Sequence, residues 1–369
     1  MPPAPIAPAA TAKLLPSRVT PLKRLGELSL MDLESVLLLL DGQSVVDWRR
    51  LDFTSQEEAV RFLETNAFDP SNPADHARLE AVKDGAVDYL KRQFDFPIPR
   101  PLAKSTVLEL LGTASTKGHR QLAACTILKA MHIIHHVEAR ELQYSLALSD
   151  QELFRLIEER VYRLVGQMLA EGLPITEFVG GRKRRDSIFT KLLSKREAHA
   201  SAVYDKQRFR IVTRSKDDIL PVLLYLTHNL FAFNYVVPGE SINTVIHFRD
   251  DCERQPHLAQ LARRLQATNE LTFSDNRFSA EDYRIIHFVV DIPVRVPQPL
   301  LDAAPPEARA LGSVIFGMCE FQIVDRETEE ANEKGDASHA SYKKRQREAV
   351  MRRLELGSTA KARTRRSPR

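Results

Sequence analysis

The chain has 369 residues, 43% of them hydrophobic and 28% charged, which is enough to bury the core of two domains or of one elaborated domain. Its three cysteines, Cys125, Cys252 and Cys319, are odd in number and far apart, which argues against a disulfide framework or a zinc site and is typical of a reducing cytoplasm. The longest apolar run near the start, 36–40, is too short to span a bilayer, and the N-terminus lacks the order of a signal peptide, so we expect no role at a membrane.

The net charge of +4 is distributed unevenly along the chain. Residues 344–369 contain ten Lys or Arg and two Glu, so this basic tail carries +8 and the rest of the chain −4. From Gly357 onward the tail has few apolar residues, and we expect it to be unstructured. Such a tail is typical both of RNA contact and of a solubilising end.

Apolar spacing predicts an all-helical region over residues 21–148, after a disordered lead over 1–20 that is rich in Pro and Ala. The helices expected there cover residues 31–40, 55–65, 75–94, 106–111 and 119–146. The last helix places His132, His135 and His136 near one face, which is open to a metal site. No H-E-x-x-H signature completes it, however, and the neighbouring apolar residues are typical of a core helix.

After residue 148 the pattern changes from helical to mixed. Ser149 is expected to cap a helix, and Gly180-Gly181 leads into four basic residues, 182–185, before a further helix start. A basic loop before a helix suits a polyphosphate, although a solvated basic turn produces the same pattern.

Short β-branched runs then predict strands over 209–212, 245–248, 285–292 and 314–324, with a helix over 218–231 between them. Strands interleaved with helices predict an α/β or α+β layer, not a helical bundle.

The strand expected at 314–324 alternates in polarity. Glu320 and Gln322 point to one face, while Phe321 and Ile323 point to the other. A mid-strand carboxylate opposite an apolar face is typical of an acid aimed into a cleft, and also of an edge strand that exposes its polar side chains to water. Asp325 is expected to cap the helix that follows.

This strand and the segment after it resemble, without gaps, the pattern E-x-Q-I-R-T followed by A-E-x-G-x-A-A-H-x-x-Y-K of the RelA/SpoT synthetase family. The matching residues are Glu320, Phe321, Gln322, Ile323, Glu333, Gly335, Ala337, His339, Tyr342 and Lys343. Three further segments occur in the family's order: Lys183 with 187–192 is similar to R-x-K-S-x-x-S-I-Y-x-K-M, 205–212 to D-x-x-G-x-R-I-I, and 283–287 to G-Y-x-S-L-H.

The resemblance covers about residues 155–345. It implies an α+β fold, a mixed β-sheet flanked by helices of the nucleotidyltransferase-like kind, in a synthetase domain over 149–345 between the helical region and a basic tail at 346–369. The N-terminal half lies outside the resemblance, and it lacks the H-D metal motif of the family's hydrolase domain.

The resemblance also implies an activity, the Mg²⁺-dependent transfer of pyrophosphate from ATP to the 3′-hydroxyl of a purine nucleotide. Asp205 and Glu320 are the implied metal ligands on neighbouring strands, and Glu320 can orient or deprotonate the attacking hydroxyl. The implied contacts to the donor nucleotide are Arg182, Lys183, Ser187, Lys191 and Arg210. The implied contacts to the acceptor are Tyr283, which would stack on the base, and His287, Gln322 and His339.

Several positions depart from the family pattern. Val324-Asp325 replaces Arg-Thr, Arg208 replaces Gly, and Gly181 stands where the family has Arg, so Arg182 would have to act from one position away. The acceptor loop is disrupted as well, because residues 244–282 are longer than the usual link and contain no lysine.

These departures leave three functions open. The first is a pyrophosphokinase acting on GDP, GTP or an adenine nucleotide. The second is the same chemistry on an RNA 3′ end such as that of tRNA, which would use the basic tail. The third is a nucleotide-sensing or RNA-binding protein that has kept the fold without turnover.

Overall fold

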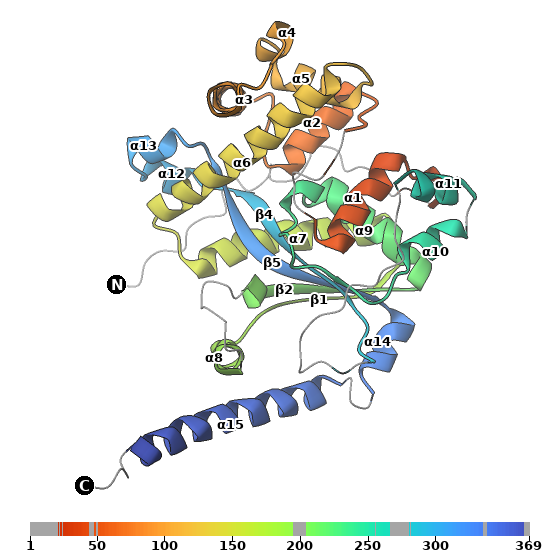
Figure 1. Cartoon of the computed structure of the whole chain (residues 1–369), viewed down its shortest axis with the longest axis vertical. Coiled ribbons are helices and arrows are strands. Elements are labelled where there is room, and N and C mark those ends of the chain that lie inside the picture. Colours follow the sequence, from red (N-terminus) through yellow and green to blue (C-terminus); the bar gives the residue numbers. More distant parts are fainter. Residues whose placement is uncertain are drawn as a thin grey trace.

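A mixed β-sheet forms the centre of the structure, a computed structural model that describes residues 21, 23, 25–43, 48, 51–194, 204–254, 256–265, 280, 282–334 and 338–364. Its strands within these residues are β1 (Ile175–Arg182), β2 (Gln207–Thr213), β3 (Ile242–Asn243), β4 (Ile286–Arg295) and β5 (Val314–Asp325), in the order β1-β2-β5-β4-β3 (Figure 1). Strands β2 and β5 are parallel, and the other neighbours are antiparallel. Helices surround this sheet, so the predicted α+β class is confirmed.

One face of the sheet is apolar and packs against α7 (Asp150–Ala170) and α9 (Ile219–Asn229). Phe321 of β5 is fully buried on this face, and its ring centroid lies 5.6 Å from that of Phe231, which follows α9. Gly317 of β5 allows a close approach, because a Cβ at this position would collide with the Ile157 side chain of α7. The predicted alternation along β5 is therefore confirmed on its apolar side.

The opposite face of the sheet changes from apolar to polar along the length of β5, and we call it the divided face. Its first half carries Phe316, whose ring centroid lies 4.7 Å from that of His136 in α6 (Gln121–Ser145). Its second half carries Glu320 and Gln322. Because β5 lies between β2 and β4, the interpretation of this segment as an edge strand is wrong.

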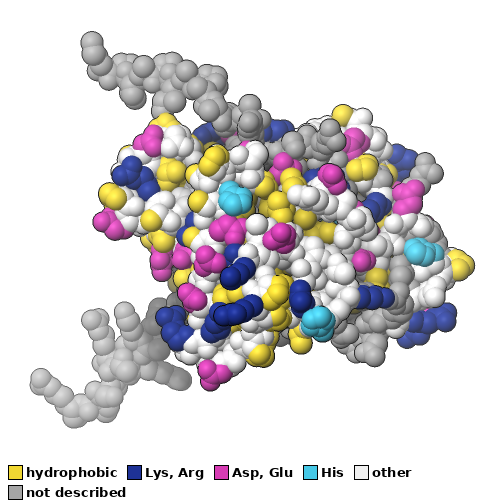
Figure 2. All heavy atoms as spheres, turned by 90° about the horizontal axis from the view of Figure 1, so that it is seen from above, with side chains coloured by type: hydrophobic (Ala, Val, Ile, Leu, Met, Phe, Trp, Pro, Cys, Tyr) yellow, Lys and Arg dark blue, Asp and Glu magenta, His cyan; other side chains and the backbone are white. Residues whose placement is uncertain are grey.

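The N-terminal region is helical, as predicted from apolar spacing. Before α6 it contains α1 (Leu30–Asp41), α2 (Gln56–Thr65), α3 (Pro73–Phe94), α4 (Arg100–Ala103) and α5 (Val107–Ser115). Side-chain caps at α1, α2, α3, α5 and α7 are supplied by Ser29, Ser55, Asn72, Thr106 and Ser149. Viewed from above α3, α4 and α5, the surface shows basic and acidic side chains interspersed with apolar ones (Figure 2).

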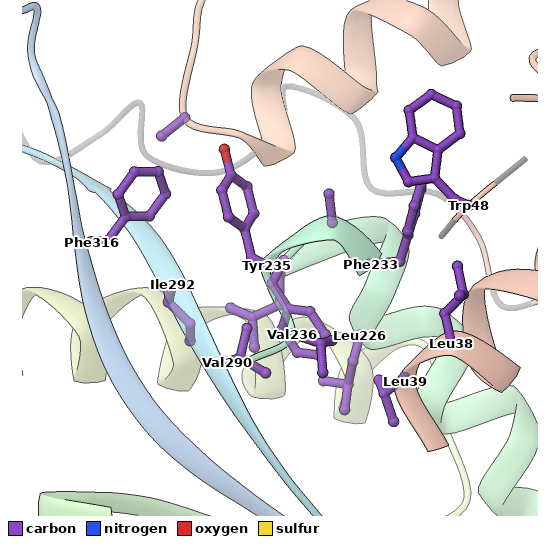
Figure 3. Packing of buried hydrophobic residues seen from close by; sticks show 14 of the residues in the cluster. Leu38, Leu39, Trp48, Leu226, Phe233, Tyr235, Val236, Val290, Ile292 and Phe316 are labelled. Atoms are coloured by element: carbon purple, nitrogen blue, oxygen red, sulfur yellow. The ribbon is translucent and has the colours of Figure 1, made fainter. Parts of the chain in front are cut away.

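The N-terminal helices and the sheet share one hydrophobic core. A single cluster of buried residues runs from Leu28, before α1, to Ile323 in β5. Figure 3 shows part of this cluster, in which side chains of α1, α9 and β4 lie together.

A buried arginine also joins the two regions. Arg160 of α7 is 2% exposed, and its guanidinium donates to the carbonyl oxygens of Thr65 at 2.7 Å, Leu230 at 2.9 Å and Pro293 at 2.9 Å. Burial lowers the pKa of Arg160 to about 10, so the group stays charged at neutral pH. These three hydrogen bonds connect the ends of α2 and α9 to β4 through α7.

The remaining helices lie beside the sheet or lead away from it. They are α8 (Arg185–Ser194), α10 (Phe248–Glu253), α11 (Pro256–Leu265), α12 (Gln298–Asp302), α13 (Pro306–Arg309), α14 (Arg326–Asn332) and α15 (His339–Thr364), with 3-10 turns at Leu25–Glu27, Tyr204–Lys206, Lys216–Asp218 and Phe233–Tyr235. None of the described helices combines the length and the apolar character needed to cross a membrane.

Three sequence predictions of local structure are wrong. Gly180-Gly181 belongs to β1 instead of a loop, and a Cβ at Gly180 would lie 2.5 Å from the Tyr162 hydroxyl of α7, so this glycine serves packing. The strand expected at 245–248 is a turn, because Asn243 Oδ1 accepts from the backbone N–H groups of Val245 and Ile246. Helix α15 continues past Gly357, where Ala, Lys and Arg are good helix formers.

The three histidines of α6 do not form a metal site. His132 Nδ1 lies 2.8 Å from Asn234 Nδ2, His136 Nε2 lies 2.7 Å from Asp291 Oδ2, and His135 is buried among apolar residues. The described residues contain no group of three or more His, Cys, Asp or Glu side chains placed to hold a metal ion. The rings pack against aromatic side chains, His132 and His136 against Tyr235 and His135 and His136 against Phe316, as expected for a core helix.

His135 is expected to make the fold sensitive to mild acid. Burial, with Arg78, His132 and His136 nearby, lowers its pKa from 6.5 to about 3, so between these pH values the unfolded chain binds the extra proton and stability falls as pH falls. From pH 7 to pH 5 this linkage amounts to about 2 kcal/mol. Urea unfolding at pH 7, 6 and 5 should show a shallower pH dependence in His135→Leu than in wild type. The exposed His119 provides the control, and a His119→Gln variant that flattens the dependence equally would contradict this assignment.

Candidate functional site

Charged and polar side chains gather on the second half of the divided face, where β1, β2, β5 and β4 run side by side. Gly181, Arg208 and Glu320 occupy one row across β1, β2 and β5, and Val289 of β4 continues it. The next row on the same face, two residues farther toward the end of β5, contains Val179, Arg210, Gln322 and His287. Side chains in one row and in alternate rows of a sheet share a face, so the strand register brings these groups together.

Glu320 lies at the centre of this face. Its side chain is 7% exposed, and its Oε1 accepts a hydrogen bond from Gln322 Nε2 at 2.5 Å and lies 3.3 Å from His287 Nε2. His287 Nδ1 is buried and has no hydrogen-bond partner among the described residues. The sheet therefore holds a nearly buried carboxylate between an amide and an imidazole that were both predicted as acceptor contacts.

Asp205 lies directly before β2 and is bound by two lysines. Lys183, which follows β1, donates to Asp205 Oδ2, and Lys191 Nζ of α8 lies 2.8 Å from Oδ1. Burial alone would raise the pKa of the Asp205 carboxyl, but the two ammonium groups lower it to about 2. Ser187 is one helical turn before Lys191, on the same side of α8. Two predicted donor contacts thus bind one predicted metal ligand, and Ser187 shares the α8 face of Lys191.

Arg210 and Tyr283 meet farther along the same face. Arg210 donates to Glu329 of α14, and its charge acts on the Tyr283 side chain, whose pKa is raised by burial. Tyr283 packs against a small apolar cluster that includes Val212 and Val324. Val324 therefore fills, with a fully buried side chain, the position where the family pattern has arginine.

The residues present are suited to hold Mg²⁺ together with a polyphosphate. The charges of both Asp205 and Glu320 act on the Lys183 ammonium group, and the turn that carries Asp205 packs against β5, which carries Glu320. Magnesium sites that use substrate phosphates as ligands commonly need only one or two protein carboxylates. Both oxygens of Asp205 are engaged by lysines here, so these contacts must loosen before the carboxylate can bind a metal.

Comparison with known proteins gives a likeness in structure only. No family model and no curated protein matches the chain. The chain is similar to solved small alarmone synthetases. Small alarmone synthetase 1 from Bacillus subtilis has 17% identity and a TM-score of 0.30, and the match covers 57% of this chain and 92% of that chain. A GTP pyrophosphokinase family protein from Streptococcus pneumoniae has 14% identity and a TM-score of 0.28, with 57% and 87% covered. Identities and TM-scores at this level assign no activity to the chain.

One predicted contact, Arg182, is not brought to this face, and another, His339, falls on a side chain outside the described part of the chain. Arg182 points toward α7, where its Nε lies 2.8 Å from Glu158 Oε1 and its Nη2 lies 2.7 Å from Oε2. It lies on the other face because neighbouring residues of β1 alternate, which could not be foreseen while this segment was interpreted as a loop. His339 begins α15, and its side chain lies outside the described part of the chain.

Arg208 is a site residue that sequence reasoning missed. Its direct cross-strand neighbours are Gly181 on β1 and Glu320 on β5, and a Cβ at Gly181 would meet nothing within 4 Å. The guanidinium is exposed beside the space that the family's arginine would occupy. The replacement of Gly by Arg at position 208 was the available signal, since it restores a cation in the same row.

Lys343 of α15 approaches the same site. Burial and the positive charges of Arg208 and Arg347 lower its pKa, while Asp205 acts in the opposite direction. Helix α15 is anchored to α8, with Arg353 donating to the Leu193 carbonyl and Gln346 Nε2 lying 3.4 Å from Ser194 Oγ. The basic helix therefore starts beside the charged face of the sheet.

Proposed function

We propose that the protein transfers pyrophosphate from ATP to the 3′-hydroxyl of a purine nucleotide. The observation that carries this proposal is the gathering of Asp205 with its two lysines, Glu320 and Arg210 on one half-face of the sheet. Phosphoryl chemistry needs little more from a protein than carboxylates for a metal ion and cations for the phosphate oxygens. The arrangement supplies both.

The proposed reaction is a nucleophilic displacement at the β-phosphorus of ATP. The 3′-hydroxyl oxygen forms a bond to this phosphorus, the bond to the α,β-bridging oxygen breaks, and AMP leaves with that oxygen. Glu320 takes the hydroxyl proton, and Gln322 and His287 hold its carboxylate through Oε1. Asp205 and Glu320 would hold Mg²⁺, which would supply positive charge to offset that of the phosphate oxygens.

The two lysines are assigned to the donor phosphates. Each is held by Asp205 before the nucleotide binds. When ATP enters, phosphate oxygens replace the carboxylate as partners of Lys183 and Lys191, which frees Asp205 for the metal. Metal and nucleotide are thus expected to bind together, because either alone leaves charges of one sign without partners.

Arg208, Arg210 and Tyr283 are assigned to the two nucleotides. Arg208 contacts the phosphate being transferred, since it is adjacent to Glu320 in the register. Tyr283, held by Arg210 and the cluster around Val324, is the surface on which the acceptor base stacks.

Helix α15 favours a second acceptor class, the 3′ end of an RNA such as tRNA. Lys343 lies close enough to the site for the charge of Asp205 to act on it, and the helix continues with Lys344, Arg345, Arg347, Arg352 and Arg353. A basic helix that leads away from the reaction centre can follow a phosphate backbone. The surface in Figure 2, by contrast, mixes both signs of charge.

Label transfer tests these assignments directly. Purified full-length protein is incubated with Mg²⁺, ATP labelled on the β-phosphate and, separately, GDP, GTP, AMP or tRNA. Label in a purine nucleotide, with AMP released in equal amount, is the expected result. Label in tRNA alone, reduced by high salt, would move the acceptor to the second class. If no acceptor is labelled although nucleotide still binds, the proposed transfer activity is wrong and a nucleotide-sensing role remains.

A further inference from the structure

A cavity lies among the N-terminal helices, and none of the residues assigned to the donor or acceptor nucleotide lines it. Its volume is about 80 Å³, and it is lined by side chains of α2, α3, α5, α6, the turn at Phe233–Tyr235 and the segment before α2. Its rings come from Trp48, Phe62, Phe68, Phe233 and Tyr235, of which Trp48, Phe233 and Tyr235 are visible in Figure 3. A single water needs only roughly 10–15 Å³ of such space, so the cavity has room for a larger molecule.

The cavity wall contains buried polar atoms without partners. His135 is 7% exposed, and neither of its ring nitrogens has a hydrogen-bond partner in the described part of the chain. The same is true of Asn234 Oδ1, whereas the Nδ2 of that amide lies 2.8 Å from His132 Nδ1. Leaving such an atom unpaired costs about 1–3 kcal/mol, so a molecule that supplies the missing hydrogen bonds is favoured.

The chemistry of the wall defines the class of molecule. Burial lowers the pKa values of His132 and His135 to about 3, so both imidazoles are neutral at physiological pH. Arg78, whose charge acts on His135, is paired with Glu138, and Lys129, whose Nζ lies 5.1 Å from the Trp48 ring centroid, is not among the residues that line the cavity. An ionic ligand would lose its hydration without meeting an opposite charge, whereas a hydroxyl can donate to one neutral acceptor and accept from an imidazole N–H.

We infer that this cavity is a binding site for a small, neutral, apolar molecule that carries one hydroxyl group. The rings of Trp48 and Phe233 enclose the apolar body, and His135 with Asn234 binds the hydroxyl. The cavity is separate from the sheet face that carries Asp205 and Glu320, since neither these carboxylates nor Lys183 and Lys191 line the cavity.

Phenol and toluene distinguish this site from a water-filled cavity. Phenol has the apolar body and the hydroxyl, and toluene has the body alone. Titration into the full chain, followed by calorimetry and by the imidazole NMR signals of His135, is expected to show phenol binding about tenfold more tightly, the effect of one buried hydrogen bond. His135→Leu should remove that preference while keeping toluene binding.

A second variant and an anionic probe complete the test. Asn234→Leu is the second variant, for use where His135→Leu does not fold, and it should reduce the preference for phenol as well. Benzoate, which is anionic, should not bind. Equal affinities of phenol and toluene for wild type, unchanged His135 signals, or a preference that survives both substitutions would each overturn the assignment and leave only water in the cavity.

Discussion

Replacing Glu320 by Gln is expected to lower the rate of pyrophosphate transfer by about 10³-fold, within the range measured for loss of a positioned general base. The substitution preserves the shape of the side chain and the contact with Gln322, but it removes the carboxylate that takes the proton. ATP affinity measured without Mg²⁺ should change by less than about threefold, because the lysines that bind the phosphates remain, whereas Mg²⁺-dependent ATP binding should weaken because Glu320 is one of the two assigned metal ligands. Rate and affinity are measured by label transfer and by calorimetry.

Asp205→Asn extends this prediction to the donor side. It should abolish transfer and also weaken Mg²⁺-dependent ATP binding, since the two lysines lose the carboxylate that orients them. Glu327→Gln is the matched control, because Glu327 is an exposed carboxylate on α14 outside the site. A Glu320→Gln variant that retains more than about a tenth of the wild-type rate would show that another group accepts the proton.

Replacing Arg160 by Leu is expected to destabilise the fold by more than about 4 kcal/mol. Three carbonyl oxygens, those of Thr65, Leu230 and Pro293, would lose their donor inside the core, and each unpaired group costs about 1–3 kcal/mol. Urea unfolding measures the change. The N-terminal helices and the sheet should then lose cooperativity, visible as separate transitions by two spectroscopic probes.

The control for Arg160 is on the same helix. Arg155 of α7 is half exposed and pairs with Glu159 one turn away, so Arg155→Leu should change stability by less than about 1 kcal/mol. Equal effects of the two substitutions would mean that the buried guanidinium contributes nothing beyond a surface pair, and that the two regions are joined by apolar packing alone.

The sequence by itself determined the features that depend on local chemistry. Alternation along residues 319–323 predicted which side chains of β5 enter the core, because the period of a strand is two and Phe321 and Ile323 must leave water. Ser55, Ser149 and Asp325 predicted helix starts, since each accepts a hydrogen bond from the backbone N–H three residues later. The residue types expected at the site, two carboxylates with lysines, were instead implied by the resemblance to the RelA/SpoT synthetase pattern.

Only the tertiary structure decided which of these residues share a face. Arg182 and Lys183 are neighbours in the sequence, yet the strand at 175–182 turns Arg182 toward Glu158 on α7, while Lys183 reaches Asp205. Arg208 entered the site only through its pairing with Gly181 and with Glu320, and the second of these pairs joins positions 112 residues apart in the sequence. Contacts of this kind depend on which strands pair, and no local pattern encodes the pairing.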